Sequence, residues 1–147
     1  MPARLQMGKV QPAAYKAMDA LDNYISTTAI EKIPQELIRI RASLINGCAY
    51  CVNYHSAEAL KAGELAQRLL LIGVWREAKN VFTPDEQLLF EMTEELTLIH
   101  KNGLSNDVYN RAIARFGEEK TAQIFMIIVT INAWNRVGVG LHMEPEL

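Results

Sequence analysis

Apolar residues recur at intervals of three and four along almost the whole chain, and this spacing is the strongest constraint on its fold. In the segment 12–26, for example, Ala13, Ala17 and Leu21 would line one side of a helix. The alternation of apolar and polar residues that indicates a β-strand is not sustained anywhere in the sequence. The sequence therefore predicts an all-α fold, a helical bundle of about six to seven helices.

Turn residues and helix caps divide this pattern into separate helices. Gly47, Gly63 and Gly117 each follow a helical stretch, at the position where glycine commonly ends a helix. Thr83 and Glu86 have the spacing of a capping box and predict the start of another helix. The last helix is apolar around most of its circumference, which predicts burial in the core or in a subunit interface. The predicted helices are 12–26, 34–46, 48–62, 64–78, 83–102, 105–116 and 118–136 or slightly beyond.

The length and charge of the chain argue against several classes of partner. Its 147 residues fit a single domain, 1–147, that is large enough to bury a core. The 17 acidic and 15 basic residues are interspersed, so we expect no basic patch for a nucleic acid or an anionic membrane. The N-terminus lacks the apolar region of a signal peptide, and the apolar runs are too short to span a membrane. We therefore expect a cytoplasmic protein, whose thiols would be mostly reduced.

The only two cysteines lie in the segment NGCAYCVNYH, residues 46–55. If a helix begins near Cys48, then Cys48, Cys51 and His55 are three and four residues apart on one helix face. The partial positive charge of a helix N-terminus lowers the pKa of a nearby thiol, and so does a neighbouring imidazolium. Because the thiolate is the nucleophilic form, this arrangement favours thiol chemistry.

Other interpretations of these three residues are weaker. Buried cysteines often act as small hydrophobic residues, although a histidine on the same face argues against that role. A zinc site needs further ligands, and His100 and His142 are isolated in the sequence. Haem attachment requires a histidine where Val52 stands, and a thioredoxin-type site requires a βαβ unit. A disulfide between residues three apart closes too small a loop to stabilise the fold much. We expect no metal and no cofactor.

A histidine that acts as a base is generally held by a third group, and Glu36 is the candidate in this chain. It lies on the predicted preceding helix, on an otherwise largely apolar face. If the two helices fold back on each other across the turn at 46–47, Glu36 approaches Cys51 and His55. The alternative is an exposed glutamate in the first helical turn, where the helix dipole favours a negative charge.

The order of Glu36, Cys48, Cys51 and His55 matches the E-x11-C-x2-C-x3-H signature of alkylhydroperoxidase D-like proteins. These proteins belong to the carboxymuconolactone decarboxylase superfamily. Three further stretches resemble the same family, namely RASLINGCAYCVNYHSAEALKAGE (41–64), VWREA (74–78) and TINAWNR (130–136). The resemblance extends from residue 34 to 139 and implies an all-α, AhpD-like fold that assembles as a homo-oligomer, typically a trimer or hexamer.

The resemblance also implies a reaction, the thiol-dependent reduction of organic hydroperoxides. Cys51 would be the peroxidatic thiol, and His55, with Glu36 behind it, would carry its proton away. Cys51 would become a sulfenic acid, which Cys48 would resolve by forming a Cys48–Cys51 disulfide. A dithiol, carried by a lipoylated or thioredoxin-like protein, would then reduce the disulfide. Because thiol exchange needs an accessible sulfur, we expect Cys48 at a solvent-reachable surface.

The chain departs from some members of that family at Tyr50, where they carry a histidine that assists the proton relay. On the last predicted helix, Trp134 and Asn135 are expected either to line the site or only to pack, and packing is the expected role of Trp134. Two other classes of function stay open. One is a general thiol–disulfide oxidoreductase or redox sensor, or a metal-binding assembly module. The other is a carboxymuconolactone decarboxylase-type lyase, in which the cysteine pair has no evident role.

Overall fold

A computed structural model describes residues 4–147, which form seven α-helices and two short 3-10 helices. No β-strand occurs between residues 4 and 147, so the predicted all-α fold is confirmed. The elements in chain order are α1 (Met7–Val10), α2 (Pro12–Ser26), α3 (Lys32–Asn46), α4 (Ala49–Lys61), α5 (Ala66–Leu71), η1 (Ile72–Glu77), α6 (Pro84–Thr97), η2 (Ile99–Lys101) and α7 (Asn106–Gly140).

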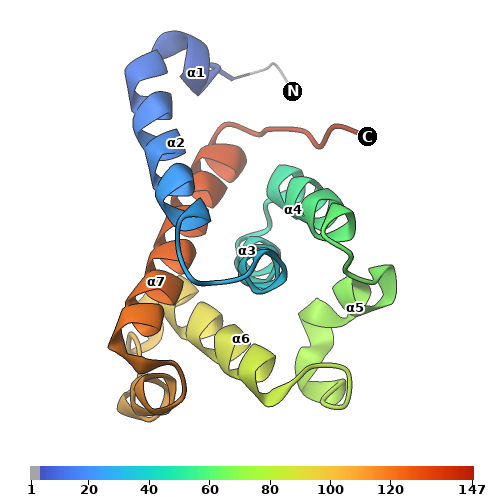
Figure 1. Ribbon diagram of the computed structural model, residues 1–147. Helices are drawn as coiled ribbons and strands as arrows, with labels where there is room; N and C mark the ends of the chain where they lie inside the picture. Colours follow the sequence, from blue (N-terminus) through green and yellow to red (C-terminus); the bar gives the residue numbers. More distant parts are fainter. Residues whose placement is uncertain (1–3) are drawn as a thin grey trace.

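Helix α3 occupies the centre of the molecule, with α2, α4, α6 and α7 around it (Figure 1). It packs directly against α4, α6 and α7. Leu37, Ile38 and Ile40 on α3 are buried, as its apolar spacing predicts. A helix that is surrounded by others also buries polar side chains, and Glu36 and Arg39 lie in the interior with them. The predicted site residue Glu36 is therefore carried by the central helix.

Two apolar clusters hold α3 from opposite sides. One lies between α2, α3, α6 and α7 and includes Ile25 and Met92. The other lies between α3, α4, η1 and α6 and is built around Phe90. The Phe90 ring centroid is 5.5 Å from that of Trp75 and 5.1 Å from that of Phe82. Each fully buried apolar side chain contributes about 1.5–3 kcal/mol, so the clusters fix the position of α3 and of the polar residues on it.

Most predicted helix boundaries are confirmed. Helix α2 spans Pro12–Ser26, and α3 ends before Gly47, whose φ of 69° lies in the left-handed region that favours glycine. The capping box of α6 is formed, with the hydroxyl of Thr83 accepting a hydrogen bond from the backbone N–H of Glu86. Helical geometry in α7 is interrupted at Gly117 (φ 79°, ψ 169°), where the sequence predicts a boundary.

Three predicted boundaries are wrong in detail. Helix α3 begins at Lys32, two residues before the predicted start at Pro34. The N–H groups of a first helical turn have no partner within the helix, so a proline is tolerated at its third residue as well as at its first. The predicted helix 64–78 is divided into α5 and η1, and its backbone is non-helical at Val74. Helix α6 ends early, at Thr97, and the 3-10 turn η2 completes the predicted segment.

Helix α7 is the one helix of residues 4–147 that is long and apolar enough to cross a membrane, judged by length and composition. A core helix of a soluble protein has the same properties. Here Ile124, Ile127 and Ile128 of α7 are buried in the interior of the fold. The expectation that the protein has no membrane partner stays a prediction.

Candidate active site

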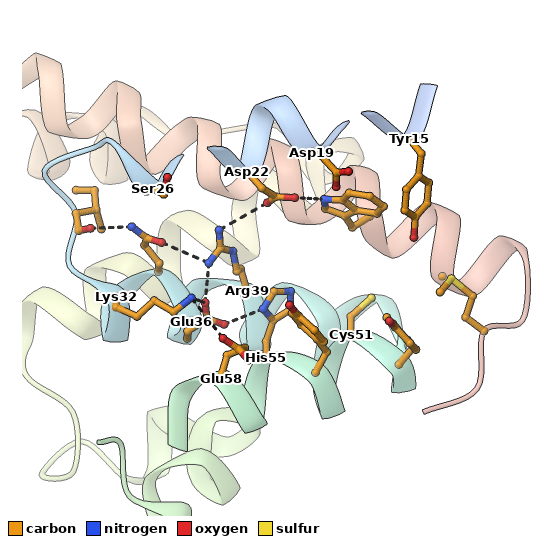
Figure 2. Close-up of a pocket in the computed structure, with 17 residues that line it drawn as sticks. Tyr15, Asp19, Asp22, Ser26, Lys32, Glu36, Arg39, Cys51, His55 and Glu58 are labelled. Carbon is orange, nitrogen blue, oxygen red and sulfur yellow. Dashed lines mark hydrogen bonds and ion pairs between the residues drawn. The ribbon is translucent and has the colours of Figure 1, made fainter. Parts of the chain in front are cut away.

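A cavity of about 590 Å³ is lined by residues of α2, α3, α4 and α7. Glu36 on α3 and both Cys51 and His55 on α4 line it, so three of the four predicted site residues reach one space (Figure 2). The remaining wall combines four aromatic residues, Tyr15, Tyr50, Tyr54 and Trp134, with polar and charged side chains of α2, α3 and α4. A molecule that enters this cavity therefore meets Cys51 and His55 on the same side of α4.

Cys48 and Cys51 are joined by a disulfide bond, the pairing that the family resemblance implies. The left-handed turn at Gly47 ends α3 abruptly, and α4 begins directly after it with Cys48 as its N-cap. The Sγ atom of Cys48 accepts a hydrogen bond from the backbone N–H of Cys51 at 3.2 Å. The sulfur of Cys48 thus occupies the positive end of α4, where a helix favours negative charge.

The two sulfurs differ in their access to the cavity. Both cysteines are buried, Cys51 with 5% and Cys48 with 2% of its surface exposed, but only Cys51 lines the cavity. Helix α7 covers Cys48 at Gly138: a Cβ atom on Gly138 would lie 2.7 Å from Cys48 Sγ and 3.3 Å from Cys51 Sγ. The expectation that Cys48 lies at a solvent-reachable surface is therefore wrong. Sequence reasoning missed Gly138, whose only signal is a glycine in an apolar helical stretch.

Glu36 and His55 form a direct contact between α3 and α4. The Oε2 atom of Glu36 is 2.7 Å from Nδ1 of His55, and the glutamate is fully buried. Two cations reach its other oxygen, Oε1: the guanidinium of Arg39 at 2.6 Å and the ammonium of Lys32 at 3.0 Å. Burial by itself would raise the pKa of this carboxyl group. The hydrogen bond from His55, together with the nearby cations, outweighs burial and lowers the pKa of Glu36 to about 2.

This contact decides which nitrogen of His55 can act as a base. Glu36 with a pKa of about 2 is ionised at neutral pH, and an ionised carboxylate only accepts hydrogen bonds. Nδ1 of His55 must therefore carry the proton that Glu36 Oε2 accepts. In the neutral imidazole the lone pair is then on Nε2, the nitrogen available to take a proton from another group.

Helix α2 extends this polar network through Asp22, a residue that sequence reasoning also missed. The Arg39 guanidinium lies 3.7 Å from one carboxylate oxygen of Asp22. The indole N–H of Trp134 donates to the other oxygen at 2.7 Å. Trp134 lines the cavity as well as packing edge-on against Tyr15, with ring centroids 5.0 Å apart. The chain of contacts from Trp134 to Asp22, Arg39, Glu36 and His55 thus connects α7 and α2 to the histidine (Figure 2).

Asn135, expected near the site, is buried outside the cavity and holds α7 against the end of α3. Its amide N–H donates to the Ser43 hydroxyl at 2.9 Å, and its carbonyl accepts from the amide of Asn46 at 2.9 Å. These bonds fix the segment in which α3 stops and α4 begins. Because Gly138 is on the same helix one turn later, they also fix its distance from the disulfide.

Tyr50 occupies the position at which some related proteins carry a histidine. Its ring stacks on Tyr54 with centroids 6.4 Å apart, and Tyr54 meets the His55 ring edge-on at 5.1 Å. Burial, with contributions from the Glu146 carboxylate and neighbouring phenols, raises the pKa of Tyr50, so it stays a neutral phenol at neutral pH.

Within residues 4–147, no group of three His, Cys, Asp or Glu side chains is placed to ligate a metal ion.

The model of the Carboxymuconolactone decarboxylase family matches residues 12–95, more than half of the chain. The chain belongs to this family. The matched region runs from α2 into α6 and includes Glu36, both cysteines and His55. The family resemblance stated from the sequence is therefore confirmed.

One protein sequence and two crystal structures, all from bacteria, are similar to this chain over most of its length. The uncharacterized protein YdfG of Bacillus subtilis (strain 168) is 32% identical over 141 residues, which cover 96% of this chain and 95% of that protein. A crystal structure from Agrobacterium tumefaciens, of unknown function and provisionally assigned as the antioxidant defence protein AhpD, is 36% identical and covers 99% of both chains with a TM-score of 0.95. An uncharacterized peroxidase-related protein from Silicibacter sp. TM1040 has the same fold at 19% identity, with a TM-score of 0.79 over 89% of this chain and 69% of that one. The AhpD-like fold is thus confirmed.

Proposed function

We propose that this carboxymuconolactone decarboxylase family member is a thiol-dependent alkyl hydroperoxide reductase in which Cys51 attacks the peroxide. The observation that carries the proposal is the buried Glu36–His55 contact in the cavity that Cys51 also lines. An ionised carboxylate that orients a histidine is the usual support of a general base next to a nucleophile. The AhpD assignment of the Agrobacterium protein agrees with this chemistry.

In the proposed reaction Cys51, His55 and Cys48 act in successive steps, while Glu36 holds His55 in place. His55 Nε2 takes the proton of the reduced Cys51 thiol, and the thiolate attacks the terminal oxygen of the hydroperoxide. The O–O bond breaks, and the alkoxide takes the proton from His55 and leaves as an alcohol. Cys51 is then a sulfenic acid, whose sulfur Cys48 attacks to form the disulfide, while the hydroxyl leaves with a proton as water. One hydroperoxide is reduced to an alcohol and water, and two thiols are oxidised.

A dithiol must return the pair to its reduced form, and we assign this role to a lipoylated or thioredoxin-like protein in the cytoplasm. No resident cofactor enters the scheme. We also propose that the protein is a homo-oligomer, a trimer or hexamer. The support is three apolar side chains of α7, Phe125, Val129 and Val139, that are each about two-fifths exposed in the single chain. Another subunit packed on α7 would cover them.

The test is hydroperoxide consumption by the reduced protein, with dihydrolipoamide and thioredoxin supplied in parallel as reductants. Cys51→Ser should abolish consumption, and Cys48→Ser should leave a sulfenic acid on Cys51 that mass spectrometry detects. His55→Gln should slow the oxidation of Cys51, whereas the matched variant His100→Gln, which changes an exposed histidine outside the cavity, should not. If both cysteine variants consume hydroperoxide like the wild type, the proposal is wrong.

The reductant assay and two further measurements, of lactone decarboxylation and of zinc content, separate the other classes of function. A disulfide that forms with hydroperoxide but is not turned over by either reductant would indicate a redox sensor. Lactone decarboxylation that persists in the double variant Cys48→Ser, Cys51→Ser would indicate a lyase. One zinc ion per chain in protein purified under reducing conditions would indicate a metal-binding module.

A further inference from the structure

We propose that the disulfide is opened only from its Cys51 side, because the backbone of α7 covers Cys48, and that Gly138 is the positioning residue whose lack of a side chain lets the disulfide form against α7. An incoming thiolate attacks Cys51 Sγ, and Cys48 is always the sulfur that leaves. The inference deepens the proposed function, on which it rests for the identity of the physiological dithiol. The direction of opening itself is a property of the disulfide and can be measured without any peroxide.

The two sulfurs differ in how accessible they are to a thiolate that enters the cavity. Cys51 lines the cavity of about 590 Å³, and Cys48 does not. The backbone of α7 approaches both sulfurs at Gly138, which itself lines the cavity, and it approaches Cys48 more closely: a Cβ atom on Gly138 would lie 2.7 Å from Cys48 Sγ and 3.3 Å from Cys51 Sγ. A thiolate that enters through the cavity therefore reaches Cys51 Sγ, while α7 blocks its approach to Cys48 Sγ.

Cys48 is also the more stable leaving group of the two cysteines. In thiol–disulfide exchange, the sulfur that departs as the more stable thiolate leaves faster. Cys48 is the N-cap of α4, and its sulfur accepts the backbone N–H of Cys51 at 3.2 Å. The partial positive charge of the helix N-terminus and this hydrogen bond both stabilise negative charge on Cys48. Steric access and electronic preference thus select the same direction.

The exchange moves the disulfide bond from the protein to the reductant in two steps. A thiolate of the reductant forms a bond with Cys51 Sγ, the Cys48–Cys51 bond breaks, and its electron pair stays on Cys48. The second thiol of the reductant gives up its proton and attacks the reductant sulfur of this mixed disulfide, which releases Cys51 as a thiolate. The two protons of the original dithiol end on the two cysteines. The reductant becomes a disulfide, and the protein pair becomes a dithiol.

Glycine at 138 is required because the sulfur of a disulfide cannot rotate away from a new neighbour. A Cβ atom 2.7 Å from Cys48 Sγ overlaps it, so an alanine forces α7 or the disulfide to move. In the reduced protein no S–S bond holds the χ1 angle of Cys48. A side chain at 138 therefore disfavours the disulfide relative to the dithiol.

The direct test maps the mixed disulfide that a monothiol forms on the oxidised wild-type protein. The protein is mixed with glutathione, quenched rapidly with excess N-ethylmaleimide, and digested for tandem mass spectrometry. The expected product carries glutathione on Cys51 and N-ethylmaleimide on Cys48. Glutathione found mainly on Cys48, or equally on both, overturns the inference.

A second test compares Gly138→Ala with Gly140→Ala on the same helix, where a Cβ atom would meet nothing within 4 Å. Gly138→Ala should lower the equilibrium constant for disulfide formation about tenfold, which corresponds to ~30 mV for a two-electron couple. Gly140→Ala should match the wild type. Equal constants for the two variants at preserved helix content overturn the role of Gly138, and if Gly138→Ala does not fold, the mapping of the wild-type protein still decides the direction of opening.

Neither measurement uses a hydroperoxide, so the two proposals fail separately. A protein that places glutathione on Cys51 but consumes no hydroperoxide contradicts only the proposed function. A protein that consumes hydroperoxide but places glutathione on Cys48 contradicts only the direction of opening.

Discussion

The Oε2 atom of Glu36 lies 2.7 Å from Nδ1 of His55, and this contact joins a fully buried carboxylate on α3 to a partly buried imidazole on α4. It places Nε2 as the basic nitrogen of His55 in the cavity that Cys51 lines. It also keeps a negative charge in the interior, where Arg39 and Lys32 balance it. Both consequences can be measured.

Replacing Glu36 with glutamine should slow the oxidation of Cys51 by cumene hydroperoxide about a hundredfold, the order of magnitude of a general base contribution. The neutral amide no longer fixes the proton on Nδ1 of His55. The measurement is a single-turnover rate by stopped flow. Glu58→Gln is the matched control, because Glu58 lines the same cavity and pairs with Lys61 and, at 4.0 Å, with Lys32, but makes no hydrogen bond to His55. Equal rates in the two variants would contradict the role of Glu36.

Stability should fall as the pH is lowered from about 4.5 to about 2. The pKa of Glu36 is depressed in the folded protein, from 4.5 to about 2, so its contribution is complete above pH 4.5 and is lost as the pH falls through that window. The shift corresponds to roughly 3 kcal/mol, and its cause is the set of contacts that the ionised carboxylate makes. Urea unfolding at a series of pH values should show this loss in the wild type and a flatter profile in Glu36→Gln. Parallel profiles would rule out a depressed pKa at Glu36.

Removing the charge of Arg39 should move the acid limb of the stability–pH profile to higher pH. Arg39 favours the ionised form of Glu36, so Arg39→Gln should raise the pKa of that carboxyl group above its wild-type value of about 2. Urea unfolding between pH 4.5 and about 2, the window in which the contribution of Glu36 is lost, measures the displacement. Arg41→Gln changes another arginine of α3, which pairs with Glu94 instead, and should leave the profile in place. A profile that shifts equally in both variants would point to a general loss of charge.

Asn135→Ala should destabilise the fold by about 2 kcal/mol, because it leaves the buried Ser43 and the partly buried Asn46 each without one hydrogen bond. The control is Asn110→Ala, an exposed asparagine on the same helix, which should change stability by less than about 0.5 kcal/mol. Denaturant unfolding of both variants gives the two values. A loss at Asn135 no larger than at Asn110 would mean that α7 holds the α3–α4 turn by other contacts.

Local signals in the sequence are sufficient to predict most of the helix boundaries. The starts at Pro12 and Thr83 and the breaks at Gly47 and Gly117 are read from caps and left-handed positions, which depend on residues within one helical turn. The division of 64–78 into α5 and η1 was missed, because a 3-10 segment of this kind has no separate signal in the apolar spacing.

Within the site, the sequence by itself determined that Cys51 and His55 share one face of a helix, since i, i+4 spacing fixes that relation once the helix forms. Cys48, expected on the same face, is instead the non-helical N-cap of α4. It also indicated Glu36 as the partner of the histidine, through the spacing that the family signature shares.

Only the tertiary structure decided which other residues join these four and which sulfur faces the cavity. Asp22 reaches Arg39 from α2, and Gly138 covers Cys48 from α7, at sequence separations of 17 and 90 residues. Such contacts depend on how helices pack across the core, and no residue within a turn of Asp22 or Gly138 encodes them. For the same reason the burial of Cys48 was predicted wrongly: its own helix exposes that position, and the backbone of α7 closes it.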